Sequence, residues 1–223
     1  MDCSISVIIP CRNGSQYLPE AVEGIRRQNM EIELIVVDDG STDTTTDLAK
    51  KMGCIVKSIP HSGLSAARNI GLKFAHGEVV LFHDHDDVMR QGALRKLVDS
   101  LWQDDMVGIV MARAKDFISS DLSAADKSAL NPRPDPYYGL LSGAVLFRHS
   151  VFRTIGSFTE GLATGQTMDI ILRAEAAGIQ VKRLDFVAVD RRLHNNNMGR
   201  SMQQQEHRDY ASILRLKLGK INF

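Results

Sequence analysis

Residues 32–43, IELIVVDDGSTD, pass from an almost continuous apolar run into a turn of acidic and small residues. A run rich in Ile and Val is typical of a strand that is buried on both faces of a parallel sheet. The turn would then lie at the carboxyl end of that strand, where open parallel sheets bind their ligands. This stretch therefore predicts both a class of fold and the edge at which a site should form.

The same alternation of buried strand and helix continues through the first 114 residues. Strands are expected at 4–10, 32–39, 54–59, 78–83 and 107–114, with helices at 15–28, 42–53, 63–77 and 92–102. Strands that alternate with helices at this spacing indicate a parallel sheet that is covered on both faces. We therefore predict an α/β fold with a Rossmann-like, mostly parallel sheet and helices on both faces.

The pattern loosens in the second half of the chain. Residues 115–136 carry prolines among small polar residues and predict a mobile loop. We assign residues 1–194 to one domain, with halves at 1–114 and 115–194. Residues 195–223 form a C-terminal helical tail in this prediction, packed on the domain or on a second copy of the chain in a homo-oligomer.

Composition argues against several classes of protein. The 27 Lys and Arg residues balance the 27 Asp and Glu residues, so a general nucleic-acid binder is not expected. Cys3, Cys11 and Cys54 have no paired spacing, and reduced thiols are therefore the default. The first apolar run is too short for a signal peptide, and no run approaches the ~20 apolar residues of a membrane span. We expect a cytoplasmic protein without a transmembrane segment.

Three carboxylates are crowded into residues 81–89, LFHDHDDVM, directly after an apolar run. At neutral pH Asp84, Asp86 and Asp87 repel one another unless a cation or a proton offsets them. An Asp-x-Asp pair suits Mg²⁺ or Mn²⁺, which bind through one or two carboxylates plus phosphate oxygens. The alternative is a solvated loop.

Polar or glycine-rich chemistry follows four successive predicted strands, which favours a site over a set of solvated turns. These strand ends are PCRNG (10–14), DDGSTD (38–43), HSGLSAARN (61–69) and HDHDD (83–87). Asp38 and Asp39 could accept hydrogen bonds from a nucleobase or ribose, and Arg68 and Asn69 could reach the base or phosphates. Neither G-x-G-x-x-G nor G-x-x-x-x-G-K-[ST] is present.

Four stretches in order resemble the family 2 glycosyltransferases of the GT-A fold. They are SVIIPCRNGSQYLPEAVEGIRRQ (6–28), ELIVVDDGSTDTT (33–45), GLSAARNIGLKFAHGEVVLFHDHDD (63–87) and GSFTEGL with MDIILRAEAAGIQV (156–162, 168–181). The resemblance implies an inverting transfer of a sugar from a nucleotide-diphosphate donor to a sugar, lipid or peptide acceptor, aided by Mg or Mn. Residues 1–114 would bind the nucleotide sugar, and residues 115–194 would face the acceptor.

The family's motifs also imply roles for individual residues. Pro10, Arg12 and Asp39 would line the base pocket, with Asp38 beside it. The predicted nucleotide-sugar-binding residues are Pro10, Arg12, Asn13, Asp38, Asp39, Gly40, Ser41, Arg68, Asn69 and Asp84. The predicted metal ligands are Asp84, Asp86 and His194, the last from the segment RRLHNNNMGR, which is similar to the family's C-terminal H…N segment.

Two departures from the family pattern bear on function. Arg12-Asn13 replaces the family's Tyr-Asn, so a base-stacking aromatic is missing, although a guanidinium plane can also stack. Gln166 and Thr167 replace an acidic pair whose Asp is the general base. A threonine cannot take a proton at neutral pH, and Asp169, two residues later, is the remaining acid. It would serve either as the base or as a pairing residue within its helix.

Two rival functions remain open at this stage. One is a catalytically weakened protein that binds a nucleotide sugar without the usual general base, which the Gln166-Thr167 pair favours. The other is a phosphotransfer fold, either receiver-like or haloacid-dehalogenase-like. Those folds place their key aspartates on the first strand, whereas the first strand here ends in PCRNG, so we rank this function lower.

Overall fold

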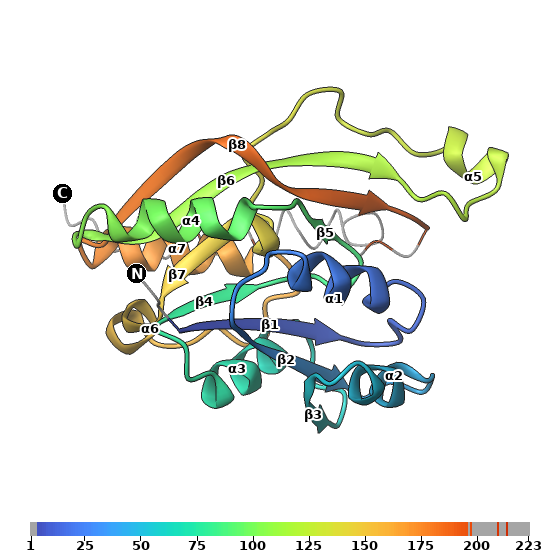
Figure 1. Ribbon diagram of the computed structural model, residues 1–223, viewed down its shortest axis with the longest axis horizontal. Helices are drawn as coiled ribbons and strands as arrows, with labels where there is room; N and C mark the ends of the chain where they lie inside the picture. Colours follow the sequence, from blue (N-terminus) through green and yellow to red (C-terminus); the bar gives the residue numbers. More distant parts are fainter. Residues whose placement is uncertain (1–3, 196, 198–208, 210–212, 214–223) are drawn as a thin grey trace.

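A computed structural model describes residues 4–195, 197, 209 and 213 (Figure 1). Its strands are β1 (Ile5–Cys11), β2 (Ile32–Asp39), β3 (Ile55–Ile59), β4 (Val79–Phe82), β5 (Val88–Met89), β6 (Val107–Ile118), β7 (Val145–Arg148) and β8 (Gln180–Leu193). Its helices are α1 (Leu18–Arg26), α2 (Thr45–Lys51), α3 (Leu64–Phe74), α4 (Ala93–Trp102), α5 (Ala124–Ser128), α6 (His149–Ile155) and α7 (Gln166–Ala176), with a 3₁₀ turn η1 (Ser142–Ala144).

The first half of the chain forms the predicted parallel sheet. Strand β1 pairs in parallel with β2 on one side and with β4 on the other, and β2 pairs in parallel with β3. Every residue of β1 and β4 is buried, as a strand covered on both faces requires. The α/β class, the covered sheet and the helices on both faces are therefore confirmed.

The second half makes the sheet more mixed than the prediction allowed. The described strands lie in the order β3-β2-β1-β4-β7-β6-β8-β5. Strand β7 pairs antiparallel with both β4 and β6, so β6 keeps the direction of β4 without being bonded to it. An apolar run shows that a strand is buried but not which neighbour it takes, because the long connection before β7 lets it enter between two earlier strands.

The predicted loop at 115–136 is partly wrong. Residues 115–118 are the last residues of β6, which pairs with β8 as far as Ile118 and Leu193. Lys115 and Asp116 look like loop residues in the sequence, but they alternate between the exposed and buried faces of a long strand. Within the remaining segment, α5 forms at 124–128, and Tyr137 exchanges both backbone hydrogen bonds with Ala114. Mobility of residues 119–136 stays a prediction.

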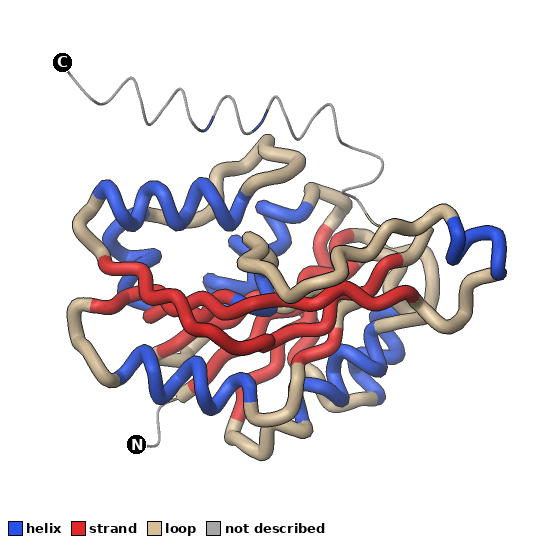
Figure 2. Tube along the Cα trace, turned by 90° about the horizontal axis from the view of Figure 1, so that it is seen from above, coloured by secondary structure: helices blue, strands red, loops and turns tan. Residues whose placement is uncertain are grey.

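Two hydrophobic clusters fill the two faces of the sheet, and Figure 2 shows helices on both sides of the strands. One cluster joins α1, α2 and α4 to alternate residues of β1 and β4, including Val7 and Leu81. The other joins α3, α6 and α7 to the intervening residues, including Ile8 and Phe82. The arrows of β1, β2, β6 and β8 point toward one end of the molecule, where α5 lies (Figure 1).

The predicted C-terminal helical tail, and any homo-oligomer contact through it, lies mostly outside the described residues. Of residues 195–223, the structure describes 195, 197, 209 and 213. Asp209 is buried and accepts hydrogen bonds from the backbone N–H groups of Ala163 and Thr164, just before α7. Among the helices of the described part, none is both long and apolar enough to cross a membrane.

Helix α3 approaches β1 so closely that Gly71 has no room for a side chain. A Cβ at this position would overlap the side chain of Ile8. We expect Gly71→Ala to lower the free energy of unfolding by about 1–3 kcal/mol, because overpacking outweighs the ~1 kcal/mol that alanine gains over glycine within a helix. Urea denaturation measures the change, and Lys73→Ala on the exposed side of the same helix is the control. A stabilised Gly71→Ala variant would contradict this packing.

Candidate functional site

The acidic pair at the end of β2 holds the turns that follow β2 and β3. Asp38 accepts hydrogen bonds from the N–H of Ser41 (3.0 Å) and the hydroxyl of Thr46 (2.5 Å). Asp39 accepts from the N–H groups of Ser62 (2.6 Å) and Gly63 (3.0 Å), which precede α3. Both carboxylates are buried and shape the edge of the sheet from within.

Arg12 and Asn13, from the turn after β1, occupy the exposed side of this edge. Asn13 has a φ of 51°, a conformation that Asn tolerates better than most residues. Its Oδ1 accepts from the N–H of Thr42 (2.8 Å), and its own N–H donates to Oγ of Ser41 (2.9 Å). The Arg12 guanidinium lies 3.1 Å from Nε2 of His61, whose Nδ1 lies 2.8 Å from Asp39. Because arginine only donates, Nε2 of His61 is the acceptor here.

Pro10, Gly40 and Ser41 complete the predicted base pocket at the same strand ends. Pro10 is buried in β1 and pairs in register with Val37. Gly40 has a φ of 72°, and a Cβ there would press on the backbone of His61. The structure therefore gathers the predicted residues of β1 and β2 at one edge. Whether they bind a nucleotide stays a prediction.

Arg68 and Asn69 of α3 are buried and already occupied by protein partners. Arg68 donates to Oδ1 of Asp84 (3.3 Å) and to the hydroxyl of Ser142, and burial lowers its pKa. Asn69 donates from its amide nitrogen to the carbonyl of Phe158 (3.0 Å) and accepts the N–H of Phe158 (2.9 Å). Arg68 thus faces the acidic loop, whereas Asn69 holds the chain that leads to α7. Their predicted contact with a donor is untested.

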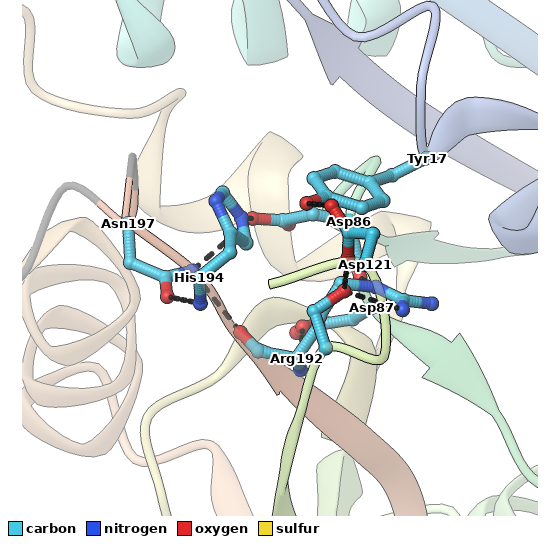
Figure 3. Close-up of polar contacts among 8 residues, drawn as sticks. Tyr17, Asp86, Asp87, Asp121, Arg192, His194 and Asn197 are labelled. Atoms are coloured by element: carbon cyan, nitrogen blue, oxygen red, sulfur yellow. Dashed lines mark hydrogen bonds and ion pairs between the residues drawn. The ribbon is translucent and has the colours of Figure 1, made fainter. Parts of the chain in front are cut away.

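Asp86 and His194 meet at the end of the sheet, in the cluster shown in Figure 3. Nε2 of His194 lies 2.9 Å from Oδ2 of Asp86, and Nδ2 of Asn197 lies 3.4 Å from the same oxygen. The Oδ1 of Asn197 accepts the backbone N–H of His194 (2.6 Å). Burial raises the pKa of the Asp86 carboxyl, but the hydrogen bond to His194, the nearby imidazoles of His85 and His194 and a backbone hydrogen bond together outweigh it, so the pKa is lowered.

Asp87 takes the opposite protonation preference. It is buried, and burial followed by the charges of Asp86 and Asp84 raises its pKa well above the usual value. Its Oδ1 accepts the backbone N–H of Arg192 (3.0 Å). The repulsion among the three carboxylates is therefore relieved by Arg68 at Asp84 and by His194 at Asp86, while the raised pKa of Asp87 makes that carboxyl easier to protonate.

The donor set fits a divalent ion only in part. The 2.9 Å between Nε2 of His194 and Oδ2 of Asp86 is a normal separation for two ligands of one ion, whereas Asp84 is turned toward Arg68. Across the described residues, no group of three or more His, Cys, Asp and Glu side chains is arranged to hold a metal alone. An ion here would need further oxygens, which Mg²⁺ and Mn²⁺ commonly take from substrate phosphates.

The position of the expected general base lies in the first turn of α7. Thr167 and Gln166 are buried there, and Gln166 donates to the carbonyl of Leu162 (2.9 Å). Asp169 accepts at Oδ2 from the hydroxyl of Thr159 (2.8 Å) and from Arg173 (2.8 and 3.1 Å). Asp169 therefore pairs within its own helix, one of the two roles considered from the sequence.

Comparison with known proteins places this arrangement in a family. The model of "Glycosyl transferase family 2" matches residues 6–158, more than half of the chain. The chain belongs to glycosyl transferase family 2. In the described part of the chain, the mixed sheet of eight strands with helices on both sides has the GT-A fold, similar to solved glycosyltransferase structures.

Two curated relatives show how much of this chain is matched. The pre-mycofactocin glycosyltransferase of Mycobacterium tuberculosis is 30% identical over 194 residues, which is 80% of this chain and 40% of the relative. The 4,4'-diaponeurosporenoate glycosyltransferase of Staphylococcus haemolyticus is 31% identical over 115 residues, 48% of this chain and 31% of the relative. The match thus spans less than half the length of either relative.

Comparison with solved structures extends the likeness over nearly the whole chain. Residues 1–349 of S. aureus TarS in complex with UDP-GlcNAc have a TM-score of 0.74 at 22% identity, and the match covers 96% of this chain and 65% of that TarS chain. The glucosyl-3-phosphoglycerate synthase of Mycobacterium tuberculosis, in complex with Mn²⁺, UDP-glucose and phosphoglyceric acid, has a TM-score of 0.70 at 20% identity. It covers 99% of this chain and 81% of the synthase. At these identities the likeness establishes the fold.

Several residues around the acidic loop of this family 2 chain were not foreseen from the sequence. The sequence predicts Tyr17 to be one of the apolar residues of a helix, but in the structure its ring centroid lies 4.8 Å from that of His194. Arg192 lies two residues before His194 and donates to the carbonyl of Asp86 (2.9 Å). Asp121 sits in a segment predicted to be a loop and accepts the Tyr17 hydroxyl (3.0 Å). Only the proximity of Arg192 to the H…N segment could have drawn attention to it.

If Asp169 is a pairing residue, its removal should affect stability. Asp169→Asn removes the charge that Arg173 pairs with at a site where the Asp side chain is 10% exposed. We expect a loss of about 1–3 kcal/mol in the free energy of unfolding by urea denaturation. The matched control is Asp99→Asn, which breaks the exposed pair with Arg95 in α4 and should cost less than about 1 kcal/mol. Equal small losses in both variants would argue against the pairing role.

Proposed function

We propose that this chain transfers a sugar from a nucleotide-diphosphate donor to an acceptor hydroxyl with inversion, aided by Mg²⁺ or Mn²⁺. The observation that carries the proposal is the pair of Asp86 and His194, brought to one point by the ends of β4 and β8. Family membership and the relatives' complexes with nucleotide sugars support it. A cytoplasmic location remains a prediction.

The nucleotide would lie along the carboxyl edge of the sheet. Its base would sit by Pro10, Arg12 and Asp39, and its ribose would face Asp38 or Asp84. Asp39 still has acceptor capacity, because a carboxylate offers about four lone-pair positions and three protein donors occupy it here. The diphosphate would then reach toward Asp86, where a cation would be shared between protein and phosphate oxygens.

The residues that would hold the ion are Asp86 and His194, with Asp84 close by. A bound divalent ion would neutralise charge that develops on the diphosphate as it leaves. His194 is buried and the Asp86 side chain is only 16% exposed, so they need little reorganisation to present their ligand atoms together. Arg68 sits behind Asp84 and balances its charge. The protein's share of this step is to fix where the diphosphate lies.

In the transfer, the acceptor oxygen would attack the anomeric carbon from the face opposite the diphosphate. The new carbon–oxygen bond forms as the bond to the diphosphate breaks, and the acceptor's proton must pass to a base. Thr167 can position the acceptor by a hydrogen bond but cannot take that proton. Asp169 is buried, and its Oδ2 is paired with Arg173.

This gap at α7 supports a second candidate function, a protein that binds the nucleotide sugar and transfers it slowly or not at all. The observation in its favour is the engagement of Asp169 by Thr159 and Arg173. The acceptor, whether a sugar, a lipid or a peptide, would approach from the half at 115–194. We expect no role for nucleic acid, because the chain carries no net positive charge.

We expect nucleoside diphosphate binding to depend on a divalent cation. Saturation at ~100 times Kd with Mn²⁺ should add about 2.7 kcal/mol of apparent stability, measured as a shift in Tm with UDP, GDP and dTDP. Asp86→Asn should abolish the shift. Asp87→Asn, which mimics the neutral form of the neighbouring carboxyl, should keep it. No shift with any of the nucleotides in the wild-type chain would refute the proposed donor site.

Thr167→Asp should separate the transferase from the binder. A general base within hydrogen-bond reach contributes roughly 10²–10⁴-fold, so we expect this variant to raise turnover by about that factor without changing donor affinity. Mn²⁺-dependent hydrolysis of the nucleotide sugar measures turnover without a known acceptor. Met168→Asp, one position further round the helix, is the control.

The opposite pattern would assign the base differently. Rapid turnover by the natural chain, lost in Asp169→Asn and not improved by Thr167→Asp, would make Asp169 the base.

A further inference from the structure

Arg192, near the end of β8, connects three segments around the acidic loop. Its Nε donates to the carbonyl of Asp86 (2.9 Å), its Nη1 to the hydroxyl of Ser119 (3.2 Å) and its Nη2 to Oε2 of Glu20 (2.5 Å). The Arg192 side chain is only 5% exposed. A buried guanidinium with every nitrogen engaged fixes the positions of its partners relative to one another.

Two aromatic rings fix the plane of this guanidinium. The rings of Tyr17 and Phe117 lie 4.8 and 4.7 Å from its central carbon. Contact with two ring faces favours a planar guanidinium over a compact ammonium. The fork of Arg192 is therefore held in the one orientation in which it reaches Asp86, Ser119 and Glu20 together.

Backbone bonds reinforce the same junction. The N–H of Arg192 donates to Oδ1 of Asp87 (3.0 Å), and the N–H of Ser119 donates to the carbonyl of Leu193 (3.0 Å). These bonds join the end of β6, the end of β8 and the loop that carries Asp86 to one another. His194, the partner of Asp86, follows Leu193 directly.

A chain of contacts leads from this junction into the acceptor-side segment and back (Figure 3). Ser119 donates its hydroxyl to Asp121, which also accepts from the hydroxyl of Tyr17 (3.0 Å) and from Gln16 (2.6 Å). The Tyr17 ring in turn packs on His194. The contacts form a closed ring, because His194 bonds the carboxylate of Asp86 and the carbonyl of Asp86 accepts from Arg192.

We propose that Arg192 is a positioning residue that fixes Asp86 against His194 and couples cation binding there to the order of residues 119–136. This inference rests on the proposed metal site. Arg192 sets the backbone of Asp86, so the carboxylate meets His194 before a ligand arrives. Through Ser119 and Asp121 the same guanidinium holds the start of the acceptor-side segment against Tyr17.

Coupling of this kind is reciprocal. If an ordered segment at 119–136 raises the affinity of Asp86 for a cation, the cation must order the segment by the same factor. Lysine at position 192 would keep the charge but lose the fork. The geometry therefore predicts that Arg192→Lys has the same effect as Arg192→Met. If the role of Arg192 were purely electrostatic, Arg192→Lys would instead behave like the wild type.

The test compares Mn²⁺ affinity with segment order in Arg192→Lys, Arg192→Met and Arg90→Met. Arg90 also bridges to β8, but its guanidinium bonds Asp190 rather than Asp86, so Arg90→Met is the matched control. Free Mn²⁺ is followed by its EPR spectrum in the presence of saturating UDP or GDP. Hydrogen exchange of peptides spanning 119–123 is measured with and without Mn²⁺, and circular dichroism confirms folding.

We expect both Arg192 variants to weaken Mn²⁺ binding about tenfold or more, within the roughly 5–150-fold usual for coupled sites. They should also lose the Mn²⁺-induced slowing of exchange at 119–123, while Arg90→Met changes neither. Tyr17→Phe, which removes only the hydroxyl bond to Asp121, serves if the Arg192 variants do not fold. In Tyr17→Phe, the factor by which Mn²⁺ slows hydrogen exchange at 119–123 and the affinity for Mn²⁺ should fall by the same amount.

Two outcomes would overturn the inference, and they differ from each other. Folded Arg192 variants that are less stable but bind Mn²⁺ within twofold of wild type would make Arg192 structural only, and the proposed function would stand. Wild-type chain that binds no Mn²⁺ with either nucleotide would remove the metal site itself and the inference with it. Affinity and exchange that change independently in Tyr17→Phe would refute the coupling.

Discussion

Mutual repulsion among Asp84, Asp86 and Asp87 is the constraint on which the candidate site depends. Three carboxylates within four residues, one buried and two partly buried, cannot all stay charged without compensation. Arg68 from α3 pairs with Asp84, and His194 after β8 pairs with Asp86, while the pKa of Asp87 is raised, which favours its neutral form. The first two compensating groups come from distant parts of the chain. The acidic loop is therefore stable only in the assembled sheet.

The unexpected topology of the second half follows from the need to bring these groups together. Strand β7 enters between β4 and β6 and displaces β6 and β8 outward. Strand β8 must then be long enough to carry His194 back to the tip of β4, and it pairs with β6 as far as Leu193. The short β5 bonds to β8 directly after the acidic loop, which anchors that loop from its other end. The length of β8 thus serves the site as much as the core.

Sequence patterns predicted the local features well because their causes are local. Continuous Ile and Val runs identified β1, β2 and β4, since a strand covered on both faces can carry no polar alternation. The order of β6, β7 and β8 in the sheet depends on which strands pair with one another, and no local sequence pattern encodes this pairing. Lys115 was assigned to a loop because polar residues in a half-exposed strand resemble loop residues. Similarly, nothing in the sequence says that Asn69 is used by Phe158 rather than left open.

The acidic side chains at the edge of the sheet have different roles, and the hydrogen-bond partners of each side chain indicate its role. Asp39 accepts three hydrogen bonds that shape the turn before α3, yet its two oxygens can accept one more. Asp86 takes donors on Oδ2 from His194 and Asn197, side chains that can give way to a cation without unfolding a turn. Asp169 instead pairs with Arg173, which also donates to the carbonyls of Ile155 and Ser157. If Asp169 acted as the base, its pairing with Arg173 would change, and the link between α6 and α7 would be disturbed. The donor edge can therefore take a ligand with its framework intact, whereas proton transfer at α7 would have to break part of that framework. This difference makes donor binding the better supported half of the proposed reaction.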